Sequence, residues 1–312
     1  MLNILYCLDE NYNYQAYTSI ISLLDNISEK IIIFVIHKDP QTFVNLPEQI
    51  SKHKNLYSLK TIKFDSENKY FPNIEDAHVS EATYYRLYIE ALLPKDIKNV
   101  LYLDCDVVCV NNPINHIKKT IKKMEVSSST IAVKTEFIKN EKHEVFFDQI
   151  GNNLYKYFNA GVMFINLEKW RECNIISKSK AIISDTSNEL LYWDQDVLNI
   201  IFQNNYLEID EILNQKVISS SDNKSILVIN GDEIFLHYMG SKKPWTLEGI
   251  AHVNSKYYQD NFMKIFLDRY HIVNNWRLYS IYLFLKNTLN FKLIRNTNYF
   301  KLIKSFSKTL NR

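Results

Sequence analysis

Glycine is scarce in this chain, and its scarcity argues against two large classes of nucleotide-binding protein. The 312 residues include five glycines, whereas about 7% of an average protein is glycine. No G-x-G-x-x-G follows a strand-like segment, and no G-x-x-x-x-G-K-[ST] occurs. An ordinary dinucleotide-binding fold and a P-loop enzyme are therefore not expected.

Paired cysteines and long apolar runs are also missing. The cysteines form no C-x-x-C motif, and three of the four lie in apolar or strand-like surroundings, so we expect reduced thiols, as in cytosolic proteins: Cys7, Cys105, Cys109 and Cys173. No uncharged apolar run approaches 18 residues, and the N-terminus has neither a basic start nor a small-residue cleavage pattern. We therefore expect no spanning helix and no signal peptide. The 46% apolar content is enough for a soluble protein with a substantial core.

Acidic residues are absent from the end of the chain. Residues 269–312 contain nine of the 37 Lys and Arg residues and none of the 35 acidic residues. On a helical wheel for residues 300–310, one side carries Phe300, Leu302, Ile303, Phe306 and Leu310, and the other carries Lys301, Lys304 and Lys308. A basic amphipathic helix of this kind favours an anionic membrane surface. Packing on the rest of the chain and nucleic-acid binding are the alternatives, and the net negative charge of residues 1–268 argues against nucleic acid.

Strand-like and helix-like segments alternate through the first two thirds of the chain. Two buried strands at residues 3–8 and 30–37 enclose apolar residues at helical spacing, which predicts a βαβ unit. Further strands are predicted at residues 59–64, 99–110, 130–133, 157–167 and 233–240, and helices at residues 80–94, with Ser80 as N-cap, and from residue 193. The alternation predicts an α/β fold with a mostly parallel sheet flanked by helices. Ligands of such sheets bind beyond the carboxyl ends of the strands.

Two aspartates interrupt the apolar segment NVLYLDCDVVCV at residues 99–110. In a strand, Asp104 and Asp106 would point to the same side. At roughly 4 Å their charges repel by about 1 kcal/mol in water and about 4 kcal/mol at an effective dielectric near 20. A divalent cation such as Mg²⁺ or Mn²⁺ would compensate this repulsion. The alternative is a pair of turn or capping aspartates at a strand end.

Five other segments accompany this D-x-D motif. In chain order they read LDENYNY, HVSEATYYRL, FNAGVMFINLEKW, WDQDVLN and HYMGSKKPW, with the D-x-D after the second. In this order and spacing, residues 2–246 resemble glycosyltransferase family eight, which includes lipopolysaccharide galactosyl- and glucosyltransferases. The resemblance implies a GT-A fold, a Rossmann-like sheet flanked by helices. It also implies transfer of a hexose from a UDP-sugar, dependence on Mn²⁺, with Mg²⁺ possible, and retention of the anomeric configuration.

The resemblance also implies roles for individual residues. Asp104, Asp106 and His237 would bind the metal, leaving open positions for the diphosphate of the UDP-sugar. Lys243 would contact the diphosphate, and Gly240 would let the backbone approach it. The uridine would lie against the residues that follow the first strand and against the D-x-D turn: Asp9, Asn11, Tyr12 and Cys105. The donor sugar and its anomeric carbon would be surrounded by the catalytic set of Arg86, Asn159, Asp194 and Gln195.

Structural roles are the alternatives for several of these residues. His237 could be a core histidine and Gly161 a packing glycine. Asp194 and Asp196 could cap the helix from residue 193, and capping is the reading we prefer for Asp196. Asn159 could be a strand-edge turn residue, and Arg86 could pair with Glu90.

The sequence departs from the family pattern at one place. Relatives carry an aspartate near the donor sugar, whereas this chain has Lys134, Thr135 and Glu136 there. The departure weakens a specific assignment to UDP-galactose. On the acceptor side, His78 and Tyr12 lie where relatives line the cleft.

The sequence therefore predicts a catalytic domain at residues 1–268 and a basic aromatic helical segment at residues 269–312. The expected function is retaining, Mn²⁺-dependent transfer of galactose or glucose to a saccharide of a lipopolysaccharide, capsule or glycoprotein glycan. We expect a cytoplasmic protein attached peripherally to the inner membrane face through residues 274–312, without a nucleic-acid partner. Two other readings stay open, an inactive UDP-sugar-binding protein and a nucleic-acid-binding scaffold. The chemistry stays open too, between Gln195 as a nucleophile and attack by the acceptor on the face that UDP leaves.

Overall fold

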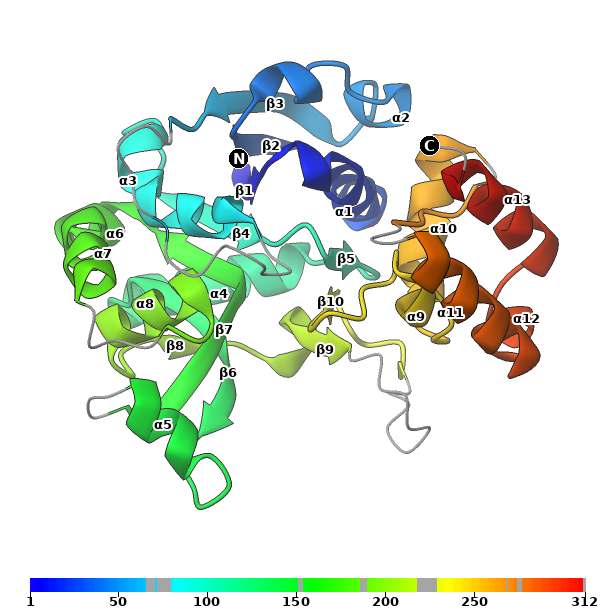
Figure 1. Cartoon of the computed structure of the whole chain (residues 1–312). Helices are drawn as coiled ribbons and strands as arrows, with labels where there is room; N and C mark the ends of the chain where they lie inside the picture. The colour runs from blue at the N-terminus through cyan, green and yellow to red at the C-terminus, as the bar shows by residue number, and fades with distance from the viewer. Residues whose placement is uncertain are drawn as a thin grey trace.

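A seven-stranded sheet forms the centre of the protein, with strand order β3-β2-β1-β4-β7-β6-β8 (Figure 1). The computed structural model describes residues 1–65, 71, 80–150, 154–185, 190–217, 229–267, 269–273 and 277–310. The strands are β1 Leu2–Leu8, β2 Ile31–His37, β3 Leu56–Lys63, β4 Asn99–Leu103, β6 Ile131–Ile138, β7 Lys156–Asn166 and β8 Leu207–Glu208. Strand β7 is antiparallel to both of its neighbours, and the other pairs are parallel. The predicted mostly parallel sheet is confirmed.

Helices cover both faces of this sheet, which is why its central strands are apolar almost throughout. Ile4, Tyr6 and Leu8 of β1 face one core, and Leu5 and Cys7 face the other. The first core contains residues of α1 Asn13–Asn26 and α4 Ile114–Ser127, and the second contains residues of η3 Glu81–Tyr88, α3 Ile89–Leu92, α6 Leu167–Glu172, α7 Ile175–Ser184 and α8 Trp193–Phe202. The shorter helices are η1 Glu10–Tyr12, η2 Pro40–Phe43, α2 Glu48–Ser51, α5 Glu144–Ile150 and η4 Glu211–Leu213. All four cysteines are free, as predicted.

A small second sheet corrects the prediction of one strand at residues 99–110. Strand β4 ends at Leu103, and β5 Val107–Cys109 belongs to a three-stranded sheet with β10 Phe235–Tyr238 and β9 Gln215–Val217. Asp104 to Asp106 therefore form the turn between two sheets, in which the Val107 N–H donates to the Asp104 carbonyl at 3.1 Å. Alternation along one strand is not what brings the two carboxylates together.

The helices after position 268 pack on helices that precede it. Before this position lie α9 Leu247–Ile250 and α10 Ser255–Phe266, and after it lie α11 Arg277–Leu289, α12 Lys292–Asn296 and α13 Tyr299–Leu310. One apolar cluster joins Leu247 and Ile250 of α9 with Phe284 of α11 and with Leu302 and Phe306 of α13. Residues on either side of position 268 thus share one core, and the boundary predicted there stays a prediction.

This packing corrects the expected use of the apolar side of residues 300–310. Leu302 and Phe306 are buried, and the Phe306 ring stacks on the Phe284 ring with centroids 4.3 Å apart. The face predicted to meet a membrane is thus partly occupied by protein, because Leu302 and Phe306 belong to the core that α13 shares with α9 and α11. Phe300 and Ile303 of the same helix stay exposed. Within the described residues, no helix combines the length and the apolar character needed to cross a membrane.

Candidate active site

The predicted site residues gather at the edge where the parallel strands end. Asp9 directly follows β1, and Asp104 directly follows β4. Because β7 is antiparallel, its early residues Asn159 and Gly161 reach the same edge, where the Asp104 N–H donates to the Gly161 carbonyl at 2.8 Å. Strand β10 brings His237 opposite Val107, just past the D-x-D turn.

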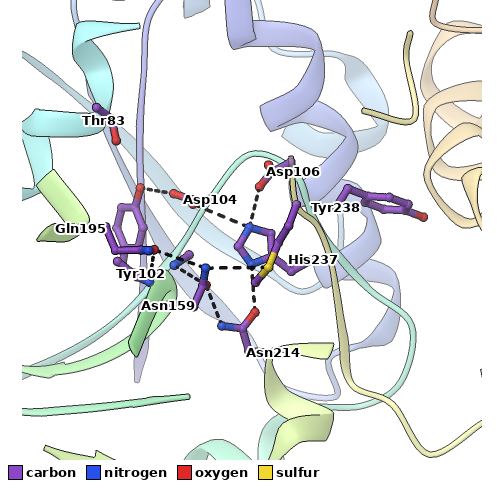
Figure 2. Close-up of polar contacts among 12 residues, drawn as sticks. Thr83, Tyr102, Asp104, Asp106, Asn159, Gln195, Asn214, His237 and Tyr238 are labelled. Atoms are coloured by element: carbon purple, nitrogen blue, oxygen red, sulfur yellow. Dashed lines mark hydrogen bonds and ion pairs between the residues drawn. The ribbon is translucent and has the colours of Figure 1, made fainter. Parts of the chain in front are cut away.

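Asp104, Asp106 and His237 form a cluster that could hold a metal ion. One ligand atom from each lies within 4.8 Å of the others. The His237 Nε2 lies 3.3 Å from Asp106 Oδ1 and 3.9 Å from Asp104 Oδ2 (Figure 2). Asp106 Oδ1 is buried without a hydrogen-bond partner among the residues that the structure describes. Two carboxylates, one of them with this buried oxygen, and an imidazole fit Mn²⁺ or Mg²⁺.

Two cations of the protein lie beside the carboxylates. Arg86 Nη1 lies 3.3 Å from Asp104 Oδ1, and Lys243 forms an ion pair with Asp106. Burial disfavours the charged form of Asp106, but Lys243 and His237 outweigh it and hold the pKa of Asp106 below its usual range. Asp104 also accepts a hydrogen bond from the Tyr102 hydroxyl. The repulsion expected from the D-x-D is thus partly compensated within the protein itself.

Arg86 is held by Asp194, not by Glu90. Its Nε lies 2.7 Å from Asp194 Oδ2, and its Nη1 donates to the Ala160 carbonyl at 2.7 Å. Glu90 instead accepts the N–H of Ile175 at 3.2 Å, so the Arg86–Glu90 alternative is wrong. Burial disfavours a charged guanidinium, yet Asp104 and Asp194 raise the pKa of Arg86 above its ordinary value. Arg86 therefore stays charged between the metal cluster and α8.

Amide side chains form the wall beside this cluster. Asn159 is a buried residue within β7, not a turn residue at a strand edge. Its Nδ2 donates to Gln195 Oε1 and to Glu136 Oε2, both at 3.3 Å. Gln195 Oε1 also accepts the Ala160 N–H at 2.9 Å, and Gln195 Nε2 donates to the Tyr157 hydroxyl at 3.2 Å. These groups can bind sugar hydroxyls, which both donate and accept hydrogen bonds.

The region of residues 134–136 contributes one side chain to the wall. Lys134 forms an ion pair with Glu208, and the Thr135 hydroxyl also donates to Glu208. Glu136 contacts Asn159 and forms an ion pair with Lys216 of β9. Glu136 is thus the acid at this position of the site, two residues after Lys134.

Two of the four residues assigned to uridine, Tyr12 and Cys105, line a cavity beside the cluster. Asp9 is buried and caps η1 by accepting the Asn11 N–H at 2.9 Å. A cavity of about 100 Å³ lies among Tyr12, Cys105, Arg86, Lys243 and the D-x-D carboxylates. His78 lies outside the described residues.

Two glycines have physical reasons to be glycine. A Cβ on Gly161 would lie 2.1 Å from His237 Cε1 and 2.8 Å from Asp104 Oδ2, so any side chain there would displace the cluster. Gly240 has φ +79°, a left-handed conformation that other residues rarely adopt. Gly161 thus does more than fill a packing position, because it makes the space that the His237 ring occupies.

Asp196 keeps the structural role preferred for it. Its carboxylate accepts hydrogen bonds from the Tyr157 hydroxyl and, at 2.7 Å, from the Tyr192 N–H at the start of α8. Asp194, by contrast, contacts Arg86 and the Thr83 hydroxyl across the site.

Sequence reasoning missed Asn214 and Thr83. Asn214, which directly follows η4, contacts both His237 and Asn159. Asn214 lies outside all the motif segments, and Thr83 lies within HVSEATYYRL without having been singled out there; the contacts of both residues join elements far apart in the chain.

Comparisons with known proteins agree with this geometry. The sequence model of "Glycosyl transferase family 8" matches residues 3–249. A lipopolysaccharide 1,2-glucosyltransferase of Escherichia coli is 32% identical over 259 residues, which cover 78% of this chain and 73% of that protein. A lipopolysaccharide 1,3-galactosyltransferase of Salmonella typhimurium is 26% identical over 267 residues, covering 82% and 77%.

Solved structures give the fold. The galactosyltransferase LgtC, crystallised with donor and acceptor sugar analogs, superposes with a TM-score of 0.68 at 21% identity, covering 89% of this chain and all of that chain. The apo bifunctional glycosyltransferase WbbM gives a TM-score of 0.63 at 17% identity, covering 91% and 52%. The predicted GT-A fold is confirmed.

Proposed function

Because the chain belongs to glycosyl transferase family 8, we propose that it moves a hexose from a UDP-sugar to a saccharide hydroxyl with retention of the anomeric configuration. The observation that supports this most directly is the cluster of Asp104, Asp106 and His237, in which the buried Asp106 Oδ1 has no hydrogen-bond partner in the described part of the chain and Lys243 pairs with Asp106. A divalent cation held there would neutralise charge on the departing diphosphate. Mn²⁺ is the proposed ion, and Mg²⁺ has the same preference for carboxylate oxygens.

Different residues of the chain are proposed to bind the diphosphate, the uridine and the sugar of the donor. Lys243 and Tyr12 line the cavity proposed for the diphosphate and the uridine. Asp9 and Asn11, which are joined by a hydrogen bond just before Tyr12, are proposed as further contacts of the uridine. The sugar then lies toward the wall of Arg86, Asn159, Asp194 and Gln195, with Glu136 behind it. Asp194 holds Arg86 in place through the 2.7 Å ion pair.

We propose that the acceptor attacks on the face that UDP leaves. The bond between the anomeric carbon and the diphosphate oxygen breaks, the bond to the acceptor oxygen forms, and the acceptor's proton passes to the departing diphosphate. Gln195 is poorly suited to be a nucleophile, because it is a neutral amide whose Oε1 already accepts hydrogen bonds from Ala160 N–H and Asn159 Nδ2. Its proposed role is to hold the wall and to stabilise positive charge at the anomeric carbon.

Galactose and glucose both fit the proposal. The relatives include a lipopolysaccharide 1,2-glucosyltransferase and a lipopolysaccharide 1,3-galactosyltransferase. We propose a saccharide acceptor of a lipopolysaccharide, capsule or glycoprotein glycan, at the inner face of the cytoplasmic membrane.

The proposed membrane contact is the outer face of α11. Leu278, Tyr282, Leu285 and Leu289 repeat at positions i, i+4, i+7 and i+11 of this helix, and each is more than half exposed. Lys286 borders the stripe and is exposed as well. An apolar stripe with neighbouring basic residues suits an anionic membrane surface. The buried face of α13 packs in the core that it shares with α9 and α11, whereas these four residues of α11 lie outside that core.

A donor screen tests the function. The protein is incubated with Mn²⁺ and each common UDP-hexose, with and without saccharide acceptors, and UDP release is measured. We expect release with UDP-galactose or UDP-glucose, and loss of release in Asp106→Asn. UDP binding without release from any donor would instead support an inactive UDP-sugar-binding protein, and salt-dependent oligonucleotide binding that UDP does not affect would support a nucleic-acid scaffold.

A further inference from the structure

Asn214 lies between His237 and the sugar-binding wall, and its position is set by two short elements. It is the residue after η4 and directly precedes β9, and its N–H donates to the Glu211 carbonyl at 2.9 Å. Strand β9 pairs in parallel with β10, with Lys216 opposite His237. Asn214 is buried, so its amide must find partners within the protein. Figure 2 shows it directed at both His237 and Asn159.

The orientation of the neighbouring amides follows from backbone donors that cannot be reversed. The N–H of Gly161 lies 3.0 Å from Asn159, so the Asn159 atom facing it must be the carbonyl oxygen Oδ1. In the same way, the N–H of Ala160 requires Gln195 Oε1 to face it. Asn159 Nδ2 then donates to Gln195 Oε1 and Glu136 Oε2, both acceptors, so the assignment is consistent at each step.

The same series of hydrogen bonds extends from Asn159 through Asn214 to His237. Asn159 Oδ1 also contacts Asn214 at 2.9 Å, and because an oxygen cannot donate, the Asn214 atom facing it must be Nδ2. The other end of that amide, Oδ1, therefore faces His237 Nδ1 at 2.9 Å and can only accept a hydrogen bond. His237 must then carry a proton on Nδ1, and in a neutral ring the lone pair lies on Nε2, which faces Asp106 and Asp104.

We propose that Asn214 is a positioning residue that fixes the Nδ1–H tautomer of His237 and so presents Nε2 as the metal-binding nitrogen. The inference rests on the proposed function in that it takes Asp104, Asp106 and His237 as the metal ligands. A partner that orients a ligand histidine typically changes metal affinity by about 10- to 100-fold when it is removed. The same amide joins the second sheet to β7, so it also connects the metal cluster to the Asn159 wall.

Two substitutions separate these connections. Asn214→Leu keeps the approximate size but removes both hydrogen bonds. Asn214→Asp keeps an acceptor for His237 Nδ1–H, while its second oxygen faces Asn159 Oδ1 and cannot donate to it. We expect Asn214→Leu to weaken the binding of Mn²⁺ alone by about 10- to 100-fold, and Asn214→Asp to remain within a few-fold of the natural chain.

Mn²⁺ affinity is measured on the full chain by isothermal titration, with the tautomer of His237 read from ¹⁵N shifts of labelled histidine. His237→Gln identifies the signal. Asn199→Asp is the matched control, because Asn199 is another buried asparagine whose amide bonds to β7, through Phe158 N–H at 2.8 Å. It should lower stability without changing Mn²⁺ affinity.

The proposal is overturned if His237 of the natural chain carries its proton on Nε2, a result that needs no variant to fold. It is also overturned if folded Asn214→Leu binds Mn²⁺ as tightly as the natural chain, or if Asn214→Asp loses as much affinity as Asn214→Leu. A Nδ1–H signal with weakened Mn²⁺ binding in Asn214→Leu, but no UDP release from any sugar nucleotide, would support the positioning role and remove the proposed function.

Discussion

Lys243 forms an ion pair with Asp106, which lies 137 residues earlier in the chain, and also donates to the Tyr238 carbonyl at 2.7 Å. The ammonium group therefore lies beside one proposed metal ligand and at the border of the 100 Å³ cavity proposed for the donor. A lysine held there can exchange part of its contact with Asp106 for a contact with a diphosphate.

Replacing Lys243 should weaken UDP binding. A hydrogen bond to a charged group contributes about 1.5–3 kcal/mol, so Lys243→Met should raise the Kd for UDP, measured with Mn²⁺ present, by about 10- to 100-fold. Lys242→Met removes the same charge one residue earlier and should leave the Kd almost unchanged. Equal affinities in the two variants would show that Lys243 does not contact the diphosphate.

Gln195→Ala should slow transfer without abolishing it. The variant loses the hydrogen bonds to Ala160 N–H and Asn159, which weakens the wall around the sugar, and a decrease in kcat of about 10- to 100-fold is expected. Intact-mass measurement of the quenched natural enzyme should show no hexose attached to the protein. A covalent hexose on the natural chain, together with no detectable transfer by the variant, would instead make Gln195 the nucleophile.

Sequence patterns predicted the elements that have a continuous apolar run or a single apolar helical face. Strands β1, β2 and β7 and helix α8 lie where continuous apolar runs or helical spacing placed them. The break between β4 and β5 was missed because Val107 to Cys109 are as apolar as the strand before them, and only pairing with β10 assigns them to another sheet. The buried side of α13 was misread for a related reason, since an amphipathic pattern does not distinguish a protein core from a membrane.

The site too has residues that sequence motifs identify and residues that only tertiary contacts identify. Its motif residues converge as the family resemblance implied, because D-x-D follows β4, WDQD begins α8, and HYMG starts within β10, which pairs with β5 just after the D-x-D turn. Asn214 lies in no motif segment, and nothing in HVSEATYYRL distinguishes Thr83 from its neighbours, because the importance of both residues comes from the partners they contact in the fold, His237 and Asp194.

Asp196 should make stability depend on pH. Burial raises the pKa of Asp196 to about 6, although hydrogen bonds from Tyr157 and from the Tyr192 N–H oppose the shift. The unfolded value is near 3.9, so between about pH 4 and pH 6 the folded state binds more protons, and the free energy of unfolding falls as the pH rises through that window. A shift of about two units corresponds to about 3 kcal/mol at most.

Urea unfolding at about pH 4 and pH 7 measures this contribution. From pH 4 to pH 7, the free energy of unfolding of the natural chain should fall by up to about 3 kcal/mol more than that of Asp196→Asn, because the amide cannot titrate. Asp148→Asn, which changes an acid with an exposed side chain paired with Lys139, should keep the pH dependence of the natural chain. An identical pH dependence in Asp196→Asn would show that this carboxyl ionises normally in the fold.

The outer face of α11 should carry membrane binding. Deleting residues 274–312 would also remove Leu302 and Phe306 from the core they share with α9, so substitutions on the surface are the sharper test. Leu278→Ser, Leu285→Ser and Leu289→Ser together should lower binding to vesicles containing phosphatidylglycerol by about tenfold or more. Full burial of a single leucine contributes about 1.5–3 kcal/mol, and a tenfold change in affinity corresponds to about 1.4 kcal/mol. The Kd for UDP should not change, because no described residue of α11 lines the cavity proposed for the donor. Val126→Ser, at an exposed apolar residue of α4, is the control and should bind vesicles like the natural chain. Unchanged vesicle binding in the triple variant would exclude this face. Equal binding by the natural chain to vesicles without anionic lipid would exclude a contribution from Lys286, which borders it.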